Sequence, residues 1–379
     1  MRSLTRAAVS FAALAVVSVG CTMVVVTALR AGVVVGGAVA VGAAVDSRPG
    51  CPAKPVCLPM MFTLGNQLSM SGTLFGRHCT FLVDTGFTYS VLSARHKPDP
   101  HNPAGILIQW DGDPGRWHAF RVHRWVATAQ QGTNRLPLVA MGPDATSLGP
   151  HGTPTSMQGE LALVQQLGDM LTESEYDAPL GGIVGASFMK RYVVRFDYPG
   201  RCISYQCVLP EMPAGTVRVR NVARGGLGTI VVPVRCTYRG RSVDLHACID
   251  TGAGASIMAQ KATRALLPED DPTRRRKTHA RFGDGDLEAY EFVAGAHPLE
   301  LVIADAAGNS VRVQPASALL LPETSAAVSA MAGHDMLLGT SFLKDLVVTI
   351  DYTVSPHYVY FERPKHFERP KQAAHVRAE

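Results

Sequence analysis

Charged residues are scarce in this chain, and helical periodicity is weak. Only 18% of its 379 residues are charged, against 46% that are hydrophobic, and this balance indicates that most of the chain is neither disordered nor fibrous. The net charge of +5 is small, and the basic residues are dispersed. The one tight basic cluster, Arg274–Lys277, follows an acidic, proline-bearing stretch that is typical of a solvated loop, so we expect no nucleic-acid partner.

Two kinds of site signal are also missing. The sequence has no Asn-x-Ser/Thr sequon, so N-glycosylation gives no information about the compartment. Its 13 histidines show no metal-ligand spacing with cysteines or carboxylates. We therefore expect no metal site.

The N-terminus carries the longest apolar run. Residues Ala7–Leu29 are predominantly apolar and uncharged, long enough to cross a bilayer, and they follow Arg2 and Arg6. A second apolar tract, Ala31–Val45, contains small residues that suit a cleavage site. Residues 1–45 are therefore a signal peptide or a membrane anchor. In either case the rest of the chain is secreted, or lies on the extracytoplasmic or lumenal side of the membrane.

Cysteine usage agrees with export. Besides Cys21 there are seven cysteines, and two pairs are close in sequence, Cys51 with Cys57 and Cys202 with Cys207. Each pair brackets a short loop, so we expect two local disulfides in an oxidising compartment. Seven is an odd number, and at least one thiol must stay free or pair outside the domain.

The chain is organised around a stretch that occurs twice, FLVDTGFTYSVL at Phe81–Leu92 and ACIDTGAGASIM at Ala247–Met258. In each copy an apolar, strand-like run ends in Asp-Thr-Gly, which places a carboxylate where the backbone turns. Glycine permits that turn, and the threonine hydroxyl can hold it by a local hydrogen bond. A single Asp-Thr-Gly is also what ordinary turns contain.

A second element follows each copy and makes the duplication clear. Gly182–Tyr198 (GIVGASFMKRYVVRFDY) and Met336–Tyr352 (MLLGTSFLKDLVVTIDY) align without a gap in the matching part. Both copies contain a glycine, a Ser-Phe pair and a closing Asp-Tyr in the same places. The chain is an internal duplication.

These paired motifs resemble those of the aspartic proteases of the retropepsin-like and pepsin-like superfamily. The resemblance implies an all-β fold of two tandem, pseudo-symmetric, β-barrel-like lobes with a central cleft. We place the lobes at residues 58–210 and 216–364, joined by a hinge at Pro210–Gly215 and followed by a disordered tail, 365–379. The resemblance also implies that the strands ending at Gly185 and Gly339 lie beside the Asp-Thr-Gly loops and support them.

Each lobe also contains a predicted β-hairpin where the family has its substrate-covering flap. The hairpins are Leu107–Trp125 and Ala280–Val293, and both have Asp-Gly steps at their tips. Trp117 and Tyr290 are candidate flap aromatics that contact substrate. The alternative for each is an aromatic side chain that packs on its own sheet.

The resemblance predicts the chemistry. Asp84 and Asp250 would face each other as catalytic residues, and two carboxylates so close share one proton. The ionised member takes a proton from water while the other donates to the scissile carbonyl, so no cofactor is needed. Supporting roles fall to two residues of each loop: Thr85, Gly86, Thr251 and Gly252.

One departure keeps a second function open. The family prefers Ala or Ser after Asp-Thr-Gly, as at Ala253, but the first lobe has Phe87. A large side chain there narrows the cleft or marks a lobe that has drifted from activity. The sequence therefore predicts a monomeric aspartic endopeptidase acting on peptides or proteins, with an inactive, protease-like binding module as the alternative.

Overall fold

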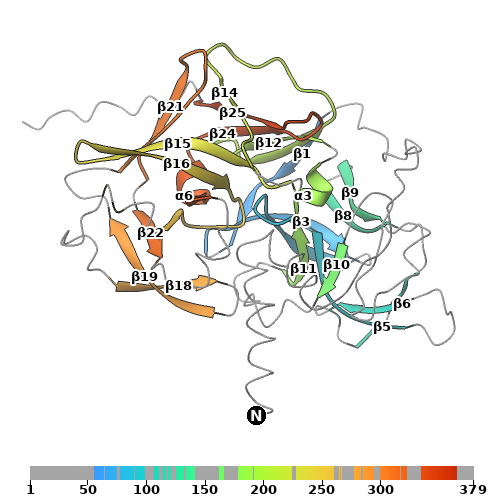
Figure 1. Cartoon of the computed structure of the whole chain (residues 1–379). Helices are drawn as coiled ribbons and strands as arrows, with labels where there is room; N and C mark the ends of the chain where they lie inside the picture. Colours follow the sequence, from blue (N-terminus) through green and yellow to red (C-terminus); the bar gives the residue numbers. More distant parts are fainter. Residues whose placement is uncertain are drawn as a thin grey trace, which may run out of the picture.

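The computed structural model describes most of residues 55–364. Its larger gaps are 99–105, 141–161, 166–177, 267–276 and 322–333, and residues 1–54 and 365–379 are not described. The described chain is almost entirely β-structure, with two four-residue helices, α3 (Ala186–Met189) and α6 (Thr340–Leu343). Its strands form three sheets, one in each half of the chain and one shared by both (Figure 1). The predicted all-β, two-lobed fold is confirmed.

The sheet of the first half has the strand order β7-β6-β5-β11-β4-β3-β8-β9, with β10 paired to β5 and β2 paired to β3. Its strands are β2 (Met61–Phe62), β3 (Leu68–Leu74), β4 (Arg77–Val83), β5 (Ser90–Pro98), β6 (Ile106–Trp110), β7 (His118–Phe120), β8 (Trp125–Gln131), β9 (Asn134–Ala140), β10 (Ala162–Gln165) and β11 (Leu180–Val184).

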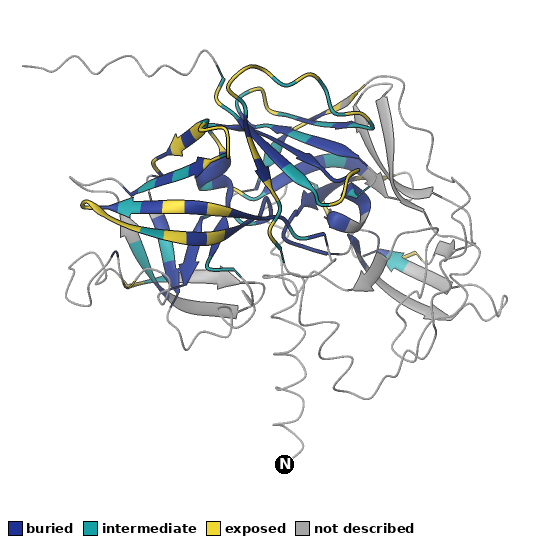
Figure 2. Ribbon diagram, turned by 45° about the horizontal axis from the view of Figure 1, so that its top comes forward, coloured by how far each residue is buried: buried dark blue, intermediate teal, exposed yellow. Residues whose placement is uncertain are grey.

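The sheet of the second half has the order β18-β19-β22-β17-β23-β16-β15-β20-β21. Its strands are β15 (Val231–Tyr238), β16 (Arg241–Ile249), β17 (Ile257–Ala259), β18 (Lys277–Phe282), β19 (Gly285–Val293), β20 (Glu300–Ala304), β21 (Ser310–Val313), β22 (Ser317–Leu321) and β23 (Met336–Leu338). At the β15–β16 turn Arg239 and Gly240 both have positive φ, as a two-residue hairpin turn requires. This hairpin runs from a buried base to an exposed tip (Figure 2).

The third sheet joins the halves in the order β1-β13-β12-β24-β25-β14. Its strands are β1 (Val56–Pro59), β12 (Val193–Asp197), β13 (Cys202–Gln206), β14 (Val217–Arg220), β24 (Val347–Asp351) and β25 (Tyr358–Glu362). At its centre β12 and β24 pair antiparallel, with Arg195 opposite Thr349. These two residues hold the same position in the duplicated motifs, so this pairing relates the two copies by a local two-fold axis.

The hydrophobic core is continuous across the two halves. One cluster contains Phe81 and Phe196 from the first half together with Ile249 and Phe342 from the second. All four side chains are at most 1% exposed. The halves therefore share one interior beneath the common sheet.

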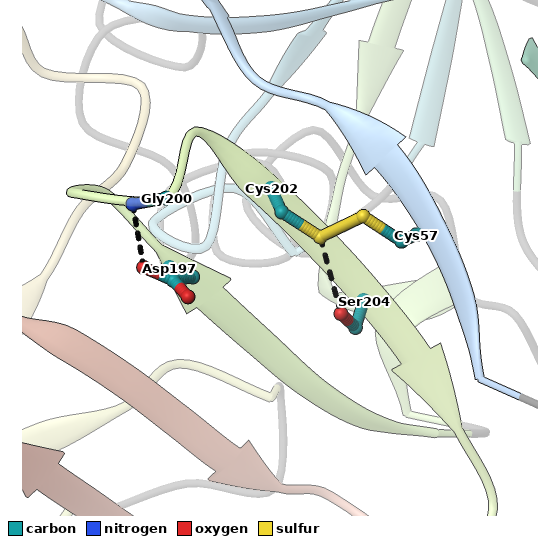
Figure 3. Close-up of a disulfide and its surroundings, with 5 residues drawn as sticks. All are labelled: Cys57, Asp197, Gly200, Cys202 and Ser204. Atoms are coloured by element: carbon teal, nitrogen blue, oxygen red, sulfur yellow. Dashed lines mark hydrogen bonds between the residues drawn. A yellow bond between two sulfur atoms is a disulfide. The ribbon is translucent and has the colours of Figure 1, made fainter.

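The predicted disulfides are wrong. Cys57 is bonded to Cys202, which excludes both local pairings, Cys51–Cys57 and Cys202–Cys207 (Figure 3). The cause is strand pairing: β1 lies antiparallel to β13, which brings Cys57 beside Cys202 although 145 residues separate them in sequence. Three further cysteines in the described part of the chain, Cys79, Cys236 and Cys248, are buried thiols.

The sequence FERPK occurs twice near the C-terminus, at Phe361–Lys365 and at Phe367–Lys371. Its first copy begins inside β25, where Phe361 is fully buried and Glu362 forms an ion pair with Arg195 of β12. The second copy and the predicted disordered tail, 365–379, lie outside the described residues.

The predicted signal peptide or anchor, residues 1–45, also lies outside the described residues. Among the residues that are described, no helix is both long and apolar enough to cross a membrane.

The Cys57–Cys202 bond should stabilise the fold mainly by restricting the unfolded chain. We expect Cys57→Ala to lower the free energy of unfolding by about 2–5 kcal/mol, because the bond closes a long loop. The measurement is urea unfolding of the full chain. Cys202→Ala and the double variant should lose no more than Cys57→Ala does, and a double variant as stable as wild type would contradict the assignment.

Candidate active site

The two Asp-Thr-Gly loops lie at equivalent places in the two halves. In each half a later strand is inserted beside the strand that ends in aspartate: β11 lies between β4 and β5, and β23 between β16 and β17. The Asp84 N–H donates to Val184 O at 3.0 Å, and the Asp250 N–H donates to Leu338 O at 3.1 Å. The predicted support of both loops by the glycine-bearing strands is confirmed.

The threonines bind the loops to each other. Thr85 Oγ1 donates to Ile249 O at 2.7 Å, and Thr251 Oγ1 donates to Val83 O at 2.6 Å. In return each hydroxyl oxygen accepts the backbone N–H of the other threonine at 3.1 Å. Both threonines are fully buried, so these four hydrogen bonds lie in the interior, and each of them connects one half to the other.

This network brings the two carboxyl groups into contact. Asp84 and Asp250 are 7% and 4% exposed, and the two carboxyl groups lie close enough for each to shift the pKa of the other. A Cβ on Gly86 would lie only 2.8 Å from the Asp250 carboxyl carbon, and one on Gly252 would come closer still to Asp84. Glycine is needed at both positions because the carboxyl groups pack directly on the opposite loop.

Backbone donors hold each carboxyl group. Asp84 Oδ1 accepts the Gly86 N–H at 2.8 Å, and Asp250 Oδ1 accepts the Ala253 N–H at 3.0 Å. Burial, followed by the neighbouring Asp250 charge, raises the pKa of Asp84 well above its usual range. Burial likewise raises the pKa of Asp250 to about 6, against the opposing effect of its hydrogen bonds. The pair is therefore arranged to keep one proton at mildly acidic pH.

Two serines belong to the site although the motif analysis did not single them out. Ser90 Oγ accepts the Gly185 N–H at 3.2 Å, and Ser256 Oγ accepts the Gly339 N–H at 3.3 Å. Each serine stands six residues after its aspartate. That shared position in the duplicated stretch is the signal that identifies them.

Phe87 does not disturb the backbone of its loop. Its N–H donates to the Asp84 backbone carbonyl at 3.3 Å, and its own carbonyl accepts the Ala186 N–H at 2.7 Å. The equivalent Ala253 makes the same two kinds of contact, to Asp250 and to Thr340. The Phe87 residue is only 3% exposed.

Trp117, one of the two predicted flap aromatics, lies outside the described residues. Described side chains near it in sequence pack onto the sheet: Trp110 Nε1 donates to Leu180 O at 2.8 Å, and buried Asp113 pairs with Arg77. Tyr290 is half-buried and packs against the core at the base of its hairpin. Its partner across the hairpin is Lys277.

Within the part of the chain that the structure describes, no group of three or more His, Cys, Asp or Glu side chains is placed to hold a metal ion.

The threonine network should be a large contributor to stability. We expect Thr85→Val to lower the free energy of unfolding by about 2–4 kcal/mol, because Ile249 O and the Thr251 N–H lose their buried partner. Thr85→Ser keeps the hydroxyl group and should cost about 1 kcal/mol for the lost methyl group. Equal losses in the two variants, measured by denaturant unfolding, would contradict this role of the hydroxyl.

The raised pKa of Asp250 predicts how stability depends on pH. A carboxyl group whose folded pKa exceeds its unfolded value stabilises the fold fully below about pH 4 and loses that contribution as pH rises through about 6. Asp250→Asn has no such loss and should exceed wild type in unfolding free energy at pH 7 by on the order of 1–3 kcal/mol. Exposed Asp244→Asn is the control and should show no gain at pH 7.

Neither a family model nor a curated protein sequence matches the chain. Among solved structures, the chain is similar to an aspartic proteinase from Irpex lacteus, with 10% identity, a TM-score of 0.42, and coverage of 82% of this chain and 98% of that one. It is also similar to the basic 7S globulin from soybean, with 12% identity, a TM-score of 0.43, and coverage of 82% and 95%. At these values neither likeness says what this chain does.

Proposed function

We propose that this chain is an aspartic endopeptidase, in which Asp84 and Asp250 hydrolyse peptide bonds by activating a water molecule. The observation that carries the proposal is the contact between two buried carboxyl groups, held together by the reciprocal bonds of Thr85 and Thr251. Burying two acids against each other is unfavourable for folding, and such pairs are concentrated at functional sites.

The reaction uses the one proton that the pair retains. The ionised carboxylate takes a proton from water, and the water oxygen forms a bond to the scissile carbonyl carbon. The protonated carboxyl group gives its proton to the carbonyl oxygen, which produces a neutral gem-diol. The carboxyl group that took the proton from water then donates it to the amide nitrogen, and the C–N bond breaks. A gem-diol hydroxyl gives its proton to the other carboxylate, so the pair is again singly protonated.

The substrate is a peptide or protein, and the reaction requires no cofactor. Because one chain supplies both loops, a monomer has the complete site. The enzyme is secreted or anchored through its N-terminal segment.

The alternative, a module that binds peptides without cleaving them, was based on Phe87. The Phe87 N–H donates to the Asp84 backbone carbonyl as the Ala253 N–H donates to the Asp250 backbone carbonyl, both at 3.3 Å, so Phe87 leaves the backbone of its loop in place. The enzyme is therefore the function that the site supports better.

Peptidase activity should disappear when either acid is neutralised. We expect Asp84→Asn and Asp250→Asn each to lower kcat by on the order of 10³-fold or more, since each carboxyl group has its own proton to move. The measurement is cleavage of a mixed peptide library between pH 4 and 7. Wild-type activity should fall at the acid end, where both groups become protonated, and at the alkaline end, where both ionise.

Asp244→Asn is the matched control, because it removes an exposed carboxylate of the same half and should retain full activity. A folded wild-type chain that cleaves no peptide, or an Asp84→Asn variant that stays active, would overturn the proposal. The first outcome would direct attention to peptide binding.

A further inference from the structure

A tight turn of the first half lies directly on the Asp250 loop of the second half. This turn, residues 63–67, leads from β2 to β3 and has Gly65 on its exposed side. The Gly65 carbonyl oxygen lies so close to Gly254 that a Cβ there would come within 1.6 Å of it. Leu68, the first residue of β3, donates its N–H to Thr251 O at 3.1 Å. The first half therefore contacts the Asp250 loop at two points besides the threonine side chains.

Hydrogen bonds within the Gly65 turn fix its shape. The Thr63 N–H donates to Gln67 O at 3.1 Å, and the Asn66 N–H donates to Thr63 O at 2.9 Å. Thr63 Oγ1 also accepts the Gln67 N–H at 3.1 Å, and Thr63 is only 5% exposed. Because burial strengthens such hydrogen bonds, the turn resists displacement of the Gly65 carbonyl group.

Gly254 is one residue away from a donor to the Asp250 carboxyl group. Its carbonyl accepts the Ser341 N–H at 3.1 Å, so Gly254 is held between α6 and the Gly65 turn. The preceding residue, Ala253, donates its N–H to Asp250 Oδ1 at 3.0 Å. A displacement of Gly254 would therefore move this N–H away from the carboxyl oxygen that it contacts.

The Asp84 loop differs at both points of contact. In the first copy the place of Gly254 is taken by Thr88, a residue that does have a side chain. Its hydroxyl oxygen is buried and, among the described residues, has no hydrogen-bond partner. Ile230 stands where Leu68 does in the other copy, and within the described chain its N–H makes no hydrogen bond to the Asp84 loop. The threonine network is symmetric, but these two contacts are not.

We propose that Gly254 is a positioning residue, through which the Gly65 turn of the first half keeps the Ala253 N–H aligned on the Asp250 carboxyl group. The contact joins two glycine backbones and buries no side chain, so it offers the fold little hydrophobic stabilisation. Alignment of a reacting group, in contrast, is sensitive to shifts of about 1 Å. The effect on hydrolysis rests on the proposed peptidase function, and the effect on the carboxyl group does not.

The test compares Gly254→Ala with Thr88→Ala, which place the same residue at equivalent points of the two loops. The added Cβ must displace the Gly65 carbonyl group, since 1.6 Å is far below any contact distance, whereas alanine is smaller than the threonine it replaces. The first readout is pH titration of both aspartates by ¹³C carboxyl shifts in the full chain. We expect the Asp250 midpoint to rise by about half a pH unit or more in Gly254→Ala, because its ionised form loses a donor. Thr88→Ala should leave that midpoint unchanged.

Thr63→Val tests the same contact from the other side and does not alter the Asp250 loop. It removes the hydroxyl group that accepts the Gln67 N–H and so loosens the Gly65 turn. The Asp250 midpoint should again rise, and Thr63→Ser should restore the wild-type value. This variant keeps the test decisive if Gly254→Ala does not fold.

The second readout is peptide hydrolysis. Gly254→Ala and Thr63→Val should each lower kcat roughly tenfold or more with little change in KM, because a misaligned carboxyl group weakens the reaction step rather than substrate binding. Thr88→Ala should keep the wild-type kcat.

An unchanged Asp250 titration in folded Gly254→Ala, or in Thr63→Val, would overturn the proposal. So would a lower melting temperature without a shift of the titration, since this is what a contact that serves the fold alone would give. If wild type cleaves no peptide, the peptidase proposal fails, yet the carboxyl titration still decides the role of Gly254.

Discussion

The structure depends on the hydrogen bonds that two threonine hydroxyl groups make across the interface between the two halves of the duplicated chain. Thr85 bonds to the strand that leads into Asp250, and Thr251 bonds to the strand that leads into Asp84. Each loop therefore has its position set by the other half. This constraint explains the glycines that follow, since Gly86 and Gly252 lie where any side chain would meet the opposite carboxyl group. It also explains why two acids remain together in an interior that disfavours their charge.

Much of the candidate site could be predicted from the sequence, because the chain contains two copies of the same motifs that can be aligned with each other. Comparing the two copies locates both aspartates, both supporting strands and the closing Asp-Tyr pairs without any structure. The same comparison would also have located Ser90 and Ser256, which stand at equivalent positions in the two copies and accept equivalent hydrogen bonds. A repeat reveals residues that serve the common fold, since both copies need them.

Long-range contacts that have no counterpart in the other copy could not be predicted by comparing the two copies. The Cys57–Cys202 bond follows from the pairing of β1 with β13. Closeness in sequence instead predicted two local disulfides, which is wrong. The hairpin aromatics were equally uncertain, because an Asp-Gly turn predicts a hairpin but not what its loop packs against. The Trp110 and Asp113 contacts onto the sheet come from tertiary structure alone.

The shared sheet has a consequence for how the molecule is held together. β12 of the first half pairs directly with β24 of the second, Arg195 binds Glu362 across them, and one core continues beneath. The segment that connects the halves is exposed, with Val208 at 78%. The covalent connection through this segment therefore contributes little to the contacts that hold the two halves together. We therefore expect the two halves to act as complementing fragments, so that a chain nicked in this segment keeps its architecture as a heterodimer made from a single gene product.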